Sequence, residues 1–356
     1  MIDDDGVERA ASSSPNLEKR RTFYFRRLYE SLGDTMFETI RLLGTVSRAE
    51  FLLPNLGSLI MGLAWGARPS TSIGDLAVMI VLSFAIINLS SAIGAQANTL
   101  SDRELDSKDK RKKQLVEAMN SFGANRLKKV LTVELILTLI LVSLFMYIQQ
   151  KPVLLLLWIV GISLGCAYSL PPTRLKSRNW LAPISLILVL AFFPVLFAYY
   201  TFTAEMNTFF LLSLTGLALT VYGVIIPTEI RDYFGDKAMG IKTLTVHLGL
   251  VKASIVAMAL LTTGAALTAI AFFLQFAYAQ HPFLSILLVA IPAAVFVVLK
   301  EFRKLYSLSK EYKTSNNSAI EEKIVHLSAH NPQWIMMITQ TYSIISIVLL
   351  LSKFLL

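Results

Sequence analysis

The sequence predicts an all-α protein that crosses a membrane many times. Of its 356 residues, 54% are hydrophobic and 16% are charged, whereas soluble domains carry about 45–50% apolar and about 25% charged residues. The mean hydropathy is +0.59. The apolar residues gather in blocks of about 17–25 residues, the length that crosses about 30 Å of hydrocarbon. These observations favour a polytopic membrane protein over a soluble enzyme with a membrane-anchoring tail.

Nine apolar blocks are expected to form transmembrane helices. They occupy residues 50–66, 75–98, 129–148, 152–170, 180–200, 209–228, 251–276, 283–299 and 335–356. Their centres hold almost no charge, because a charged side chain at the bilayer centre is costly. Glu134 is an exception near the start of the third block, and the first block is short and contains Pro54 and Asn55. We predict a bundle of nine transmembrane helices.

The Lys and Arg residues of the loops predict the orientation of this bundle. The net charge is +9, and nearly all Lys and Arg lie before the first block and after blocks two, four, six and eight. In the intervening loops, the basic residues are Arg68 and Lys151 alone. By the positive-inside rule the N-terminus is then cytoplasmic and the C-terminus lies outside. The loops account for the basic charge, so we expect membrane lipids and no nucleic acid as partners.

The chain is expected to have two parts, a cytoplasmic N-terminal segment over residues 1–47 and a membrane domain over residues 48–356. The N-terminal stretch is polar and lacks the apolar region of a cleaved signal. After it, Phe25, Met36 and Ile40 belong to an apolar repeat of three or four residues, which is typical of a helix lying in the membrane interface. No transit peptide is apparent, so we expect an integral protein of the cytoplasmic membrane.

Two groups of acidic residues follow the second and sixth apolar blocks. Asn98, Asp102 and Asp106 are spaced by four residues, as are Asp232 and Asp236, so each group shares one helix face. Both groups fall on the cytoplasmic side, where they can face one another across a cavity. Such clusters favour a bridging cation, and Mg²⁺ completes a shell of few carboxylates with water and phosphate oxygens. The sequence therefore predicts an Mg²⁺ site that holds a diphosphate on the cytoplasmic face.

Cationic side chains near the two acidic groups fit the same site. They are Lys112, Lys113, Arg174, Lys176, Arg178 and Lys242. Lys and Arg can hold a diphosphate and stabilise the charge that develops as it leaves. Anchoring to anionic lipid head groups is the alternative, and it suits most of the Lys and Arg in the segment 108–129. Arg174 and Lys176 lie in a short loop after Pro171 and Pro172, which favours a functional position.

Tyr168 lies one turn before the same loop, at the end of the fourth apolar block. An aromatic ring at this depth can stabilise a carbocation by cation–π attraction. A tyrosine of the interfacial aromatic belt is the alternative interpretation.

The order of these motifs resembles the UbiA superfamily of intramembrane prenyltransferases. The first acidic motif is followed by "YSLPPTRLKSR", residues 168–178, and then by "IRDYFGDKAMGIKTL", residues 230–244. The resemblance covers most of the chain. It implies a nine-helix bundle and Mg²⁺-dependent transfer of a prenyl chain from a polyprenyl diphosphate to a lipophilic or aromatic acceptor, with release of diphosphate.

The resemblance also implies roles for individual residues. It makes the metal ligands Asn98, Asp102, Asp106, Asp232 and Asp236, and the diphosphate contacts Asn98, Arg174, Lys176 and Lys242. Thr99 stands where many members of the family have Asp, and Glu229 stands where the second motif commonly has Asn or Asp. The Arg-Pro pair that often follows the first motif is also missing. Lys112 or Lys113 can replace the charge of that arginine, and we assign the diphosphate contact to Lys113.

The main alternative function is a secondary transporter with an acid-lined cation site. Transporters carry inverted repeats and charges near the midplane, whereas these acids lie at helix ends and their repetition is parallel. A purely structural or scaffolding protein is a weaker alternative. A CDP-alcohol phosphotransferase is also weaker, because its D-G-x-x-A-R signature is absent from this sequence. His326 and His330 could hold a transition metal but have no convincing third ligand. Cys166 is the single cysteine, which leaves no disulfide framework.

Overall fold

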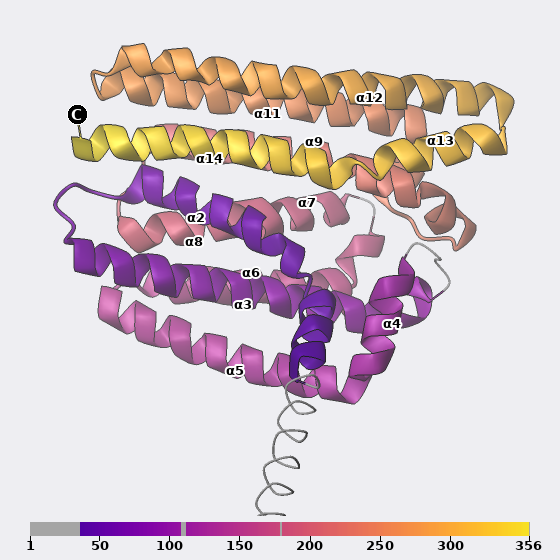
Figure 1. The fold of residues 1–356 in the computed structure, drawn as a ribbon, viewed down its shortest axis with the longest axis horizontal. Coiled ribbons are helices and arrows are strands. Elements are labelled where there is room, and N and C mark those ends of the chain that lie inside the picture. The colour runs from indigo at the N-terminus through magenta and orange to yellow at the C-terminus, as the bar shows by residue number, and fades with distance from the viewer. Residues whose placement is uncertain (1–35, 108–111, 179, 356) are drawn as a thin grey trace, which may run out of the picture.

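The computed structural model describes residues 36–107, 112–178 and 180–355, and every regular element in this part of the chain is a helix. The all-α prediction is therefore confirmed. Helices run side by side along the long axis of the molecule, with α11 and α12 at one edge and α5 at the other (Figure 1). The long helices are α2 (Leu52–Gly66), α3 (Ile73–Asp106), α5 (Ala124–Gln149), α6 (Pro152–Ser169), α9 (Thr208–Ala238), α11 (Leu250–Tyr278), α12 (Ala290–Ser315) and α14 (Asn331–Leu355).

Shorter elements connect or interrupt the long helices. They are η1 (Ala49–Phe51), α4 (Lys113–Phe122), η3 (Leu175–Ser177), α7 (Leu181–Ile187), η4 (Leu188–Phe192), α8 (Phe193–Phe202), α10 (Leu244–Leu248), η5 (Pro282–Val289) and α13 (Ser318–Ser328). The fifth apolar block, expected as one helix, forms α7, the π-helical turn η4 and α8 in succession.

Within the described residues, eight helical stretches are long and apolar enough to cross a membrane. The first apolar block forms α2, which has 15 residues, fewer than the roughly 20 that a bilayer requires. The prediction of a polytopic membrane protein is confirmed. The count of nine spans and the orientation of the bundle remain predictions.

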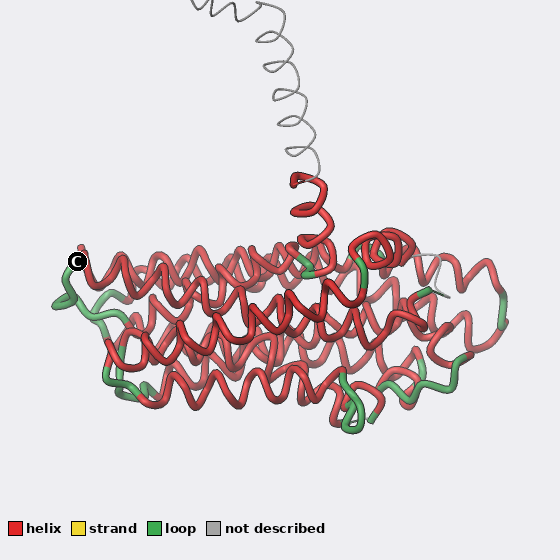
Figure 2. Tube along the Cα trace, turned by 90° about the horizontal axis from the view of Figure 1, so that it is seen from below, coloured by secondary structure: helices red, strands yellow, loops and turns green. Residues whose placement is uncertain are grey.

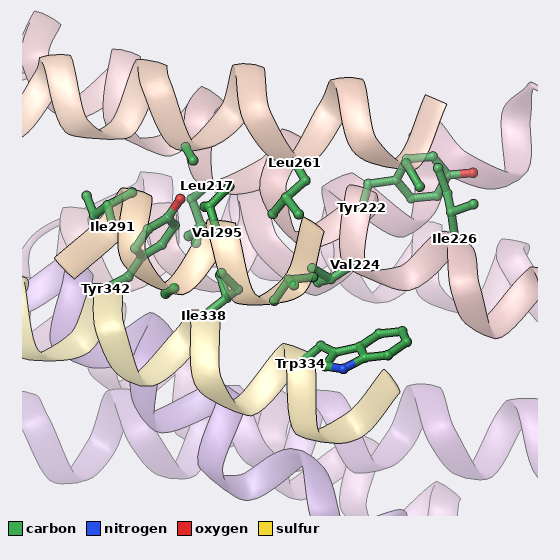
Figure 3. Packing of buried hydrophobic residues seen from close by; sticks show 14 of the residues in the cluster. Leu217, Tyr222, Val224, Ile226, Leu261, Ile291, Val295, Trp334, Ile338 and Tyr342 are labelled. Carbon is green, nitrogen blue, oxygen red and sulfur yellow. The ribbon is translucent and has the colours of Figure 1, made fainter. Parts of the chain in front are cut away.

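The α9 helix lies at the centre of the bundle. In its apolar window 61% of the residues are buried, compared with 17% for α5. The main hydrophobic cluster joins α9 to α11, α12 and α14 (Figure 3). Buried members labelled there are Leu217, Tyr222, Val224, Ile226, Leu261, Ile291, Val295, Trp334, Ile338 and Tyr342. The position of α9 in this cluster fixes the direction in which its acidic C-terminal end leaves the bundle.

Glycines allow the backbones of α9 and α11 to approach closely. A Cβ added at Gly216 would lie 2.6 Å from the backbone oxygen of Gly264, and one added at Gly223 would lie 2.7 Å from the backbone nitrogen of Leu261. Lipid supplies little hydrophobic driving force for helix association, so membrane helices associate through close van der Waals packing, which small residues allow. This close contact positions α9 against the rest of the bundle.

The helices α3 and α9 are longer than a bilayer crossing. They contain 34 and 31 residues, which at 1.5 Å per residue is about 51 and 46 Å, compared with about 30 Å of hydrocarbon. Each carries its acidic motif in its C-terminal turns. The excess length lets both motifs lie at or beyond the surface of the hydrocarbon layer.

Residues 36–46 form a helix that runs across the direction of the long helices and points away from the bundle (Figure 2). Met36, Phe37 and Ile40 are exposed on it, whereas Val46 is buried against α4 and the start of α5. Exposed apolar side chains and this direction suit a helix in the membrane interface. The earlier part of the predicted helix, including Phe25, lies outside the described residues, so the interfacial assignment and the division at residue 47 remain predictions.

Gly264→Ala is expected to destabilise the protein. Its added Cβ would lie 2.5 Å from the backbone oxygen of Gly216 and the backbone nitrogen of Thr220, and overpacking of this kind costs about 1–3 kcal/mol. Gly94→Ala is the matched control, because nothing lies within 4 Å of its added Cβ. Thermal unfolding in detergent should give a lower Tm for G264A than for G94A, and equal Tm values would contradict the close α9–α11 contact.

Candidate active site at the ends of α3 and α9

The first acidic motif lies in the last turns of α3. Asp102 and Asp106 are 7% and 3% exposed, so both carboxylates are nearly withdrawn from water. A buried carboxylate costs several kcal/mol unless a cation and hydrogen bonds compensate it. The structure supplies these partners from the loop after α6 and from the start of α4.

Two cations from the loop after α6 bind Asp102. Arg174 Nη2 lies 3.0 Å from Asp102 Oδ1, and Lys176 Nζ donates to Asp102 Oδ2. Lys176 Nζ also lies 3.1 Å from Asn98 Oδ1. The predicted neighbours Asn98, Asp102, Arg174 and Lys176 are therefore in direct contact, although α3 and this loop are about 70 residues apart.

Hydrogen bonds attach the end of α6 to α3 and hold this loop in place. Ser101 Oγ donates to the backbone oxygen of Ser169 at 2.7 Å, and Ser169 Oγ donates to Asn98 Oδ1 at 3.0 Å. Arg174 adopts a left-handed backbone conformation with φ of 36° and donates its N–H to the Leu170 oxygen. Ser101 and Ser169 were not predicted from the sequence; their positions next to Asp102 and Tyr168 were the available signal.

Lys112 lies against Asp106, and Lys113 does not. Lys112 Nζ is 2.7 Å from Asp106 Oδ1, and its side chain is 29% exposed. The side chain of Lys113 is 75% exposed and is 3.7 Å from Glu117 on the outer face of α4. Lys112 is thus the lysine that pairs with the first acidic motif, and the diphosphate contact assigned to Lys113 from the sequence remains a prediction.

The second acidic motif lies at the end of α9. Asp232 and Asp236 are partly buried, and Arg231 Nε lies 3.0 Å from Asp232 Oδ1. Lys242 is exposed in the loop between α9 and α10. This motif is closer to water than the motif of α3, which is the geometry expected at the mouth of a site.

Tyr168 connects the two motifs. Its phenol, near the end of α6, lies within electrostatic range of Asp102 on α3 and of Glu229 and Asp236 on α9. Carboxylates from both motifs therefore act electrostatically on the same tyrosine. Arg48, which precedes η1, also lies within range of Tyr168 and was not anticipated from the sequence.

Glu229 has hydroxyl partners. Tyr222 donates to its Oε1 at 3.1 Å, and Thr245 Oγ1 donates to its Oε2 at 2.8 Å. Thr245 lies on α10, so the carboxylate joins this short helix to α9. The sequence marked Glu229 as a departure from the family pattern but did not predict either partner.

Burial changes the protonation behaviour of Lys176. The loss of solvation lowers the pKa of its ammonium group below the ordinary value of 10.5, and the carboxylate of Asp102 opposes this effect. A lysine held in this way responds to a change in nearby negative charge more strongly than an exposed lysine does.

The residues present suit Mg²⁺ together with a diphosphate. Asp and Asn oxygens are hard ligands of the kind that Mg²⁺ prefers, and the buried Nε of Arg174 has no hydrogen-bond partner in the described structure. A phosphate oxygen would satisfy this donor. In the same part of the chain no three His, Cys, Asp or Glu side chains converge on one metal position, so diphosphate oxygens and water would complete the coordination.

The other sequence candidates for metal or thiol chemistry show no contact with the acidic residues of this site among the interactions of the described residues. The rings of His326 and His330 are 5.5 Å apart on the α13 side of the bundle, and His330 Nδ1 faces the Leu327 oxygen at 3.3 Å. Cys166 is a free, half-buried thiol in α6.

Comparison with solved structures identifies the same architecture in archaeal membrane proteins. A UbiA homologue from Archaeoglobus fulgidus bound to DMAPP and Mg²⁺ has a TM-score of 0.56 and 19% identity, over 84% of this chain and 99% of that one. The same homologue has also been solved with GPP and Mg²⁺. A digeranylgeranylglyceryl phosphate synthase has a TM-score of 0.56 and 16% identity, over 87% and 99%. A UbiA homologue from Aeropyrum pernix K1 has a TM-score of 0.56 and 15% identity, over 82% and 96%.

Sequence comparison gives the family. No curated protein matches the chain directly. The model of the UbiA prenyltransferase family matches residues 55–316, which include both acidic motifs and the loop that carries Arg174 and Lys176. The chain belongs to the UbiA prenyltransferase family.

Proposed function

We propose that the protein transfers a prenyl chain from a polyprenyl diphosphate to a lipophilic or aromatic acceptor inside the membrane and releases diphosphate. The contact of Asp102 with Arg174 and Lys176, at the end of a long apolar helix, carries this proposal. It places anion-binding groups and carboxylates beside hydrocarbon, as an amphipathic diphosphate ester requires. The bound DMAPP, GPP and Mg²⁺ of the archaeal homologue support the same donor class.

The cations of the site would bind the diphosphate. Arg174 and Lys176 would turn from Asp102 toward phosphate oxygens, while Lys112 at Asp106 would supply a further positive charge. Mg²⁺ held by Asn98, Asp102, Asp106, Asp232 and Asp236 would neutralise the developing charge of the leaving diphosphate. The side chains that now compensate one another would then compensate the substrate and its ion.

Tyr168 would act on the prenyl group. Its phenol is within electrostatic range of carboxylates on both α3 and α9, which supports a position near the allylic carbon as it separates from the diphosphate. Its π-face can stabilise the positive charge on that carbon, and the apolar helices around it exclude water that would otherwise capture the carbocation. We place this site on the cytoplasmic side of the cytoplasmic membrane, in agreement with the loop charges.

Purified protein supplied with labelled geranylgeranyl or farnesyl diphosphate, Mg²⁺ and candidate acceptors tests the proposal. A prenylated product together with diphosphate release supports it. Solute flux without diphosphate release would support a secondary transporter with an acid-lined cation site instead. Lipid extracts from cells that express the chain, searched for a new prenylated species, would identify the acceptor.

Asp102→Asn and Asp236→Asn are each expected to reduce diphosphate release by at least about 100-fold, because each removes a charge that holds the ion and the leaving group. Glu311→Gln is the control, since Glu311 is an exposed carboxylate of α12. Diphosphate release is measured by a coupled phosphate assay. Full activity in D102N or D236N would refute the site.

Lys112→Met is expected to weaken donor binding about tenfold, the loss that corresponds to about 1.4 kcal/mol, because Lys112 is paired with the buried Asp106. Lys113→Met is the adjacent matched control and should bind normally, since its side chain is exposed. Binding is measured from the rise in Tm with geranyl diphosphate and Mg²⁺. A larger loss of donor binding in K113M than in K112M would instead support the diphosphate contact that the sequence predicted for Lys113.

Chelation of divalent cations is expected to stop the reaction. EDTA should abolish diphosphate release, and excess Mg²⁺ should restore it, because the leaving group would otherwise depart without charge compensation. Ca²⁺ is a useful comparison, since its larger radius and looser geometry make it a poor substitute. Unchanged turnover in EDTA would show that Lys and Arg alone support ionisation.

A further inference from the structure

Glu229 differs from the neighbouring carboxylates in its partners. Asp102, Asp106 and Asp232 each form an ion pair with a lysine or an arginine. Glu229 forms no ion pair with any Lys or Arg in the described part of the chain, and its oxygens instead accept hydrogen bonds from two hydroxyl groups. Among the carboxylates of this region, Glu229 is thus a partly buried one that is held by hydroxyl groups and, within the described residues, by no Lys or Arg ion pair.

Tyr222 is a buried hydrogen-bond donor to this carboxylate. Its side chain is 2% exposed, and its hydroxyl donates to Glu229 Oε1 at 3.1 Å. Figure 3 shows the Tyr222 hydroxyl directed away from Leu217 and Leu261 of the apolar cluster. Thr245 occupies the other carboxylate oxygen, which leaves Oε1 facing the phenol.

The Tyr222–Glu229 pair reaches the candidate active site through Tyr168. Tyr168 lies within electrostatic range of both Tyr222 and Glu229, and also of Asp102. Tyr222 is therefore near the ring of Tyr168, to which the proposed function assigns stabilisation of the prenyl carbon.

Prenyl transfer releases a proton that needs an acceptor. Resting on the function proposed above, we propose that Tyr222 takes the proton of the acceptor molecule and passes its own phenolic proton to Glu229. The C–O bond to diphosphate breaks and the diphosphate keeps the electron pair. The acceptor forms a bond to the prenyl carbon, its proton moves to the Tyr222 oxygen, and the Tyr222 proton moves to Glu229 Oε1. Glu229 returns the proton to water after product release.

The different partners of the carboxylates, a cation for the aspartates and hydroxyl groups for Glu229, explain why Glu229 takes this role. A carboxylate beside a cation is stabilised in its charged form and holds a proton weakly, whereas a carboxylate without a cation in a dry environment holds a proton more strongly. The aspartates of the two motifs would also be occupied by Mg²⁺ and diphosphate during the reaction. Glu229 is hydrogen-bonded to Tyr222 and Thr245 and is not one of the residues proposed to hold the ion, so its proton capacity stays available.

The test separates ionisation of the donor from capture of the prenyl group. Wild-type protein in micelles containing total host lipid receives Mg²⁺ and geranyl diphosphate with an isotopically labelled bridging oxygen. Reversible ionisation moves this label into the non-bridging positions of the diphosphate. Capture is measured as geraniol plus all geranylated lipid, and the readout is the ratio of captured to scrambled substrate.

Glu229→Gln and Tyr222→Phe are expected to lower this ratio by about 100-fold, the usual contribution of a proton-transfer group, while scrambling and the KM for geranyl diphosphate stay unchanged. Tyr342→Phe is the matched control. Tyr342 lies on α14, and its buried hydroxyl is 3.1 Å from Oγ1 of Thr220, which shares α9 with Tyr222. The hydrogen-bond partner of Tyr342 in the described structure is thus a hydroxyl and not a carboxylate. The Y342F ratio should equal that of the wild type.

An unchanged capture ratio in Y222F overturns the proton transfer. So does an equal loss of scrambling and capture in E229Q, because Glu229 would then support ionisation. A wild-type protein that scrambles without any capture also counts against it. If E229Q does not fold, the comparison of Y222F with Y342F decides the result. A wild-type protein that neither scrambles the label nor forms any captured product refutes the proposed prenyl transfer instead, so the two failures are distinguishable.

Discussion

The pairing of buried carboxylates with cations from other segments is the interaction on which the acidic end of the bundle depends. Asp102 and Asp106 are almost fully buried, and their desolvation would be prohibitive without Arg174, Lys176 and Lys112. These partners come from the α6 loop and from the start of α4. The charges therefore decide how two connecting segments pack against the end of α3, and the same cations are the ones proposed to bind the diphosphate.

The bundle separates a polar end from an apolar interior, and α9 belongs to both. Its middle is packed against α11 through glycines and against α12 and α14 through large apolar side chains. Its C-terminal turns carry Asp232 and Asp236. A substrate with a diphosphate head and a hydrocarbon tail needs a polar and an apolar environment within its own length. Because α9 passes through both environments as one helix, it fixes the distance between them.

The carboxylates of the site form two classes by their environment. Those that contact Lys or Arg suit a role in holding an ion and a diphosphate, because their charge is already stabilised. Glu229, bonded by the hydroxyl groups of Tyr222 and Thr245, suits a role in accepting a proton. Groups of one chemical type thus acquire different functions from their partners, as burial and neighbouring charge dictate.

The sequence by itself determined the all-α membrane class, the apolar blocks and the spacing of Asp102, Asp106, Asp232 and Asp236, because hydrophobic length and helical periodicity are local properties. It also determined the family, through the order of its motifs. Only the tertiary structure decided that Lys112 meets Asp106 while Lys113 faces outward, that Ser169 binds Asn98, and that Tyr222 and Thr245 bind Glu229. Adjacent helical residues point about 100° apart, so composition alone cannot select between neighbouring lysines, and contacts between distant segments depend on how the helices pack.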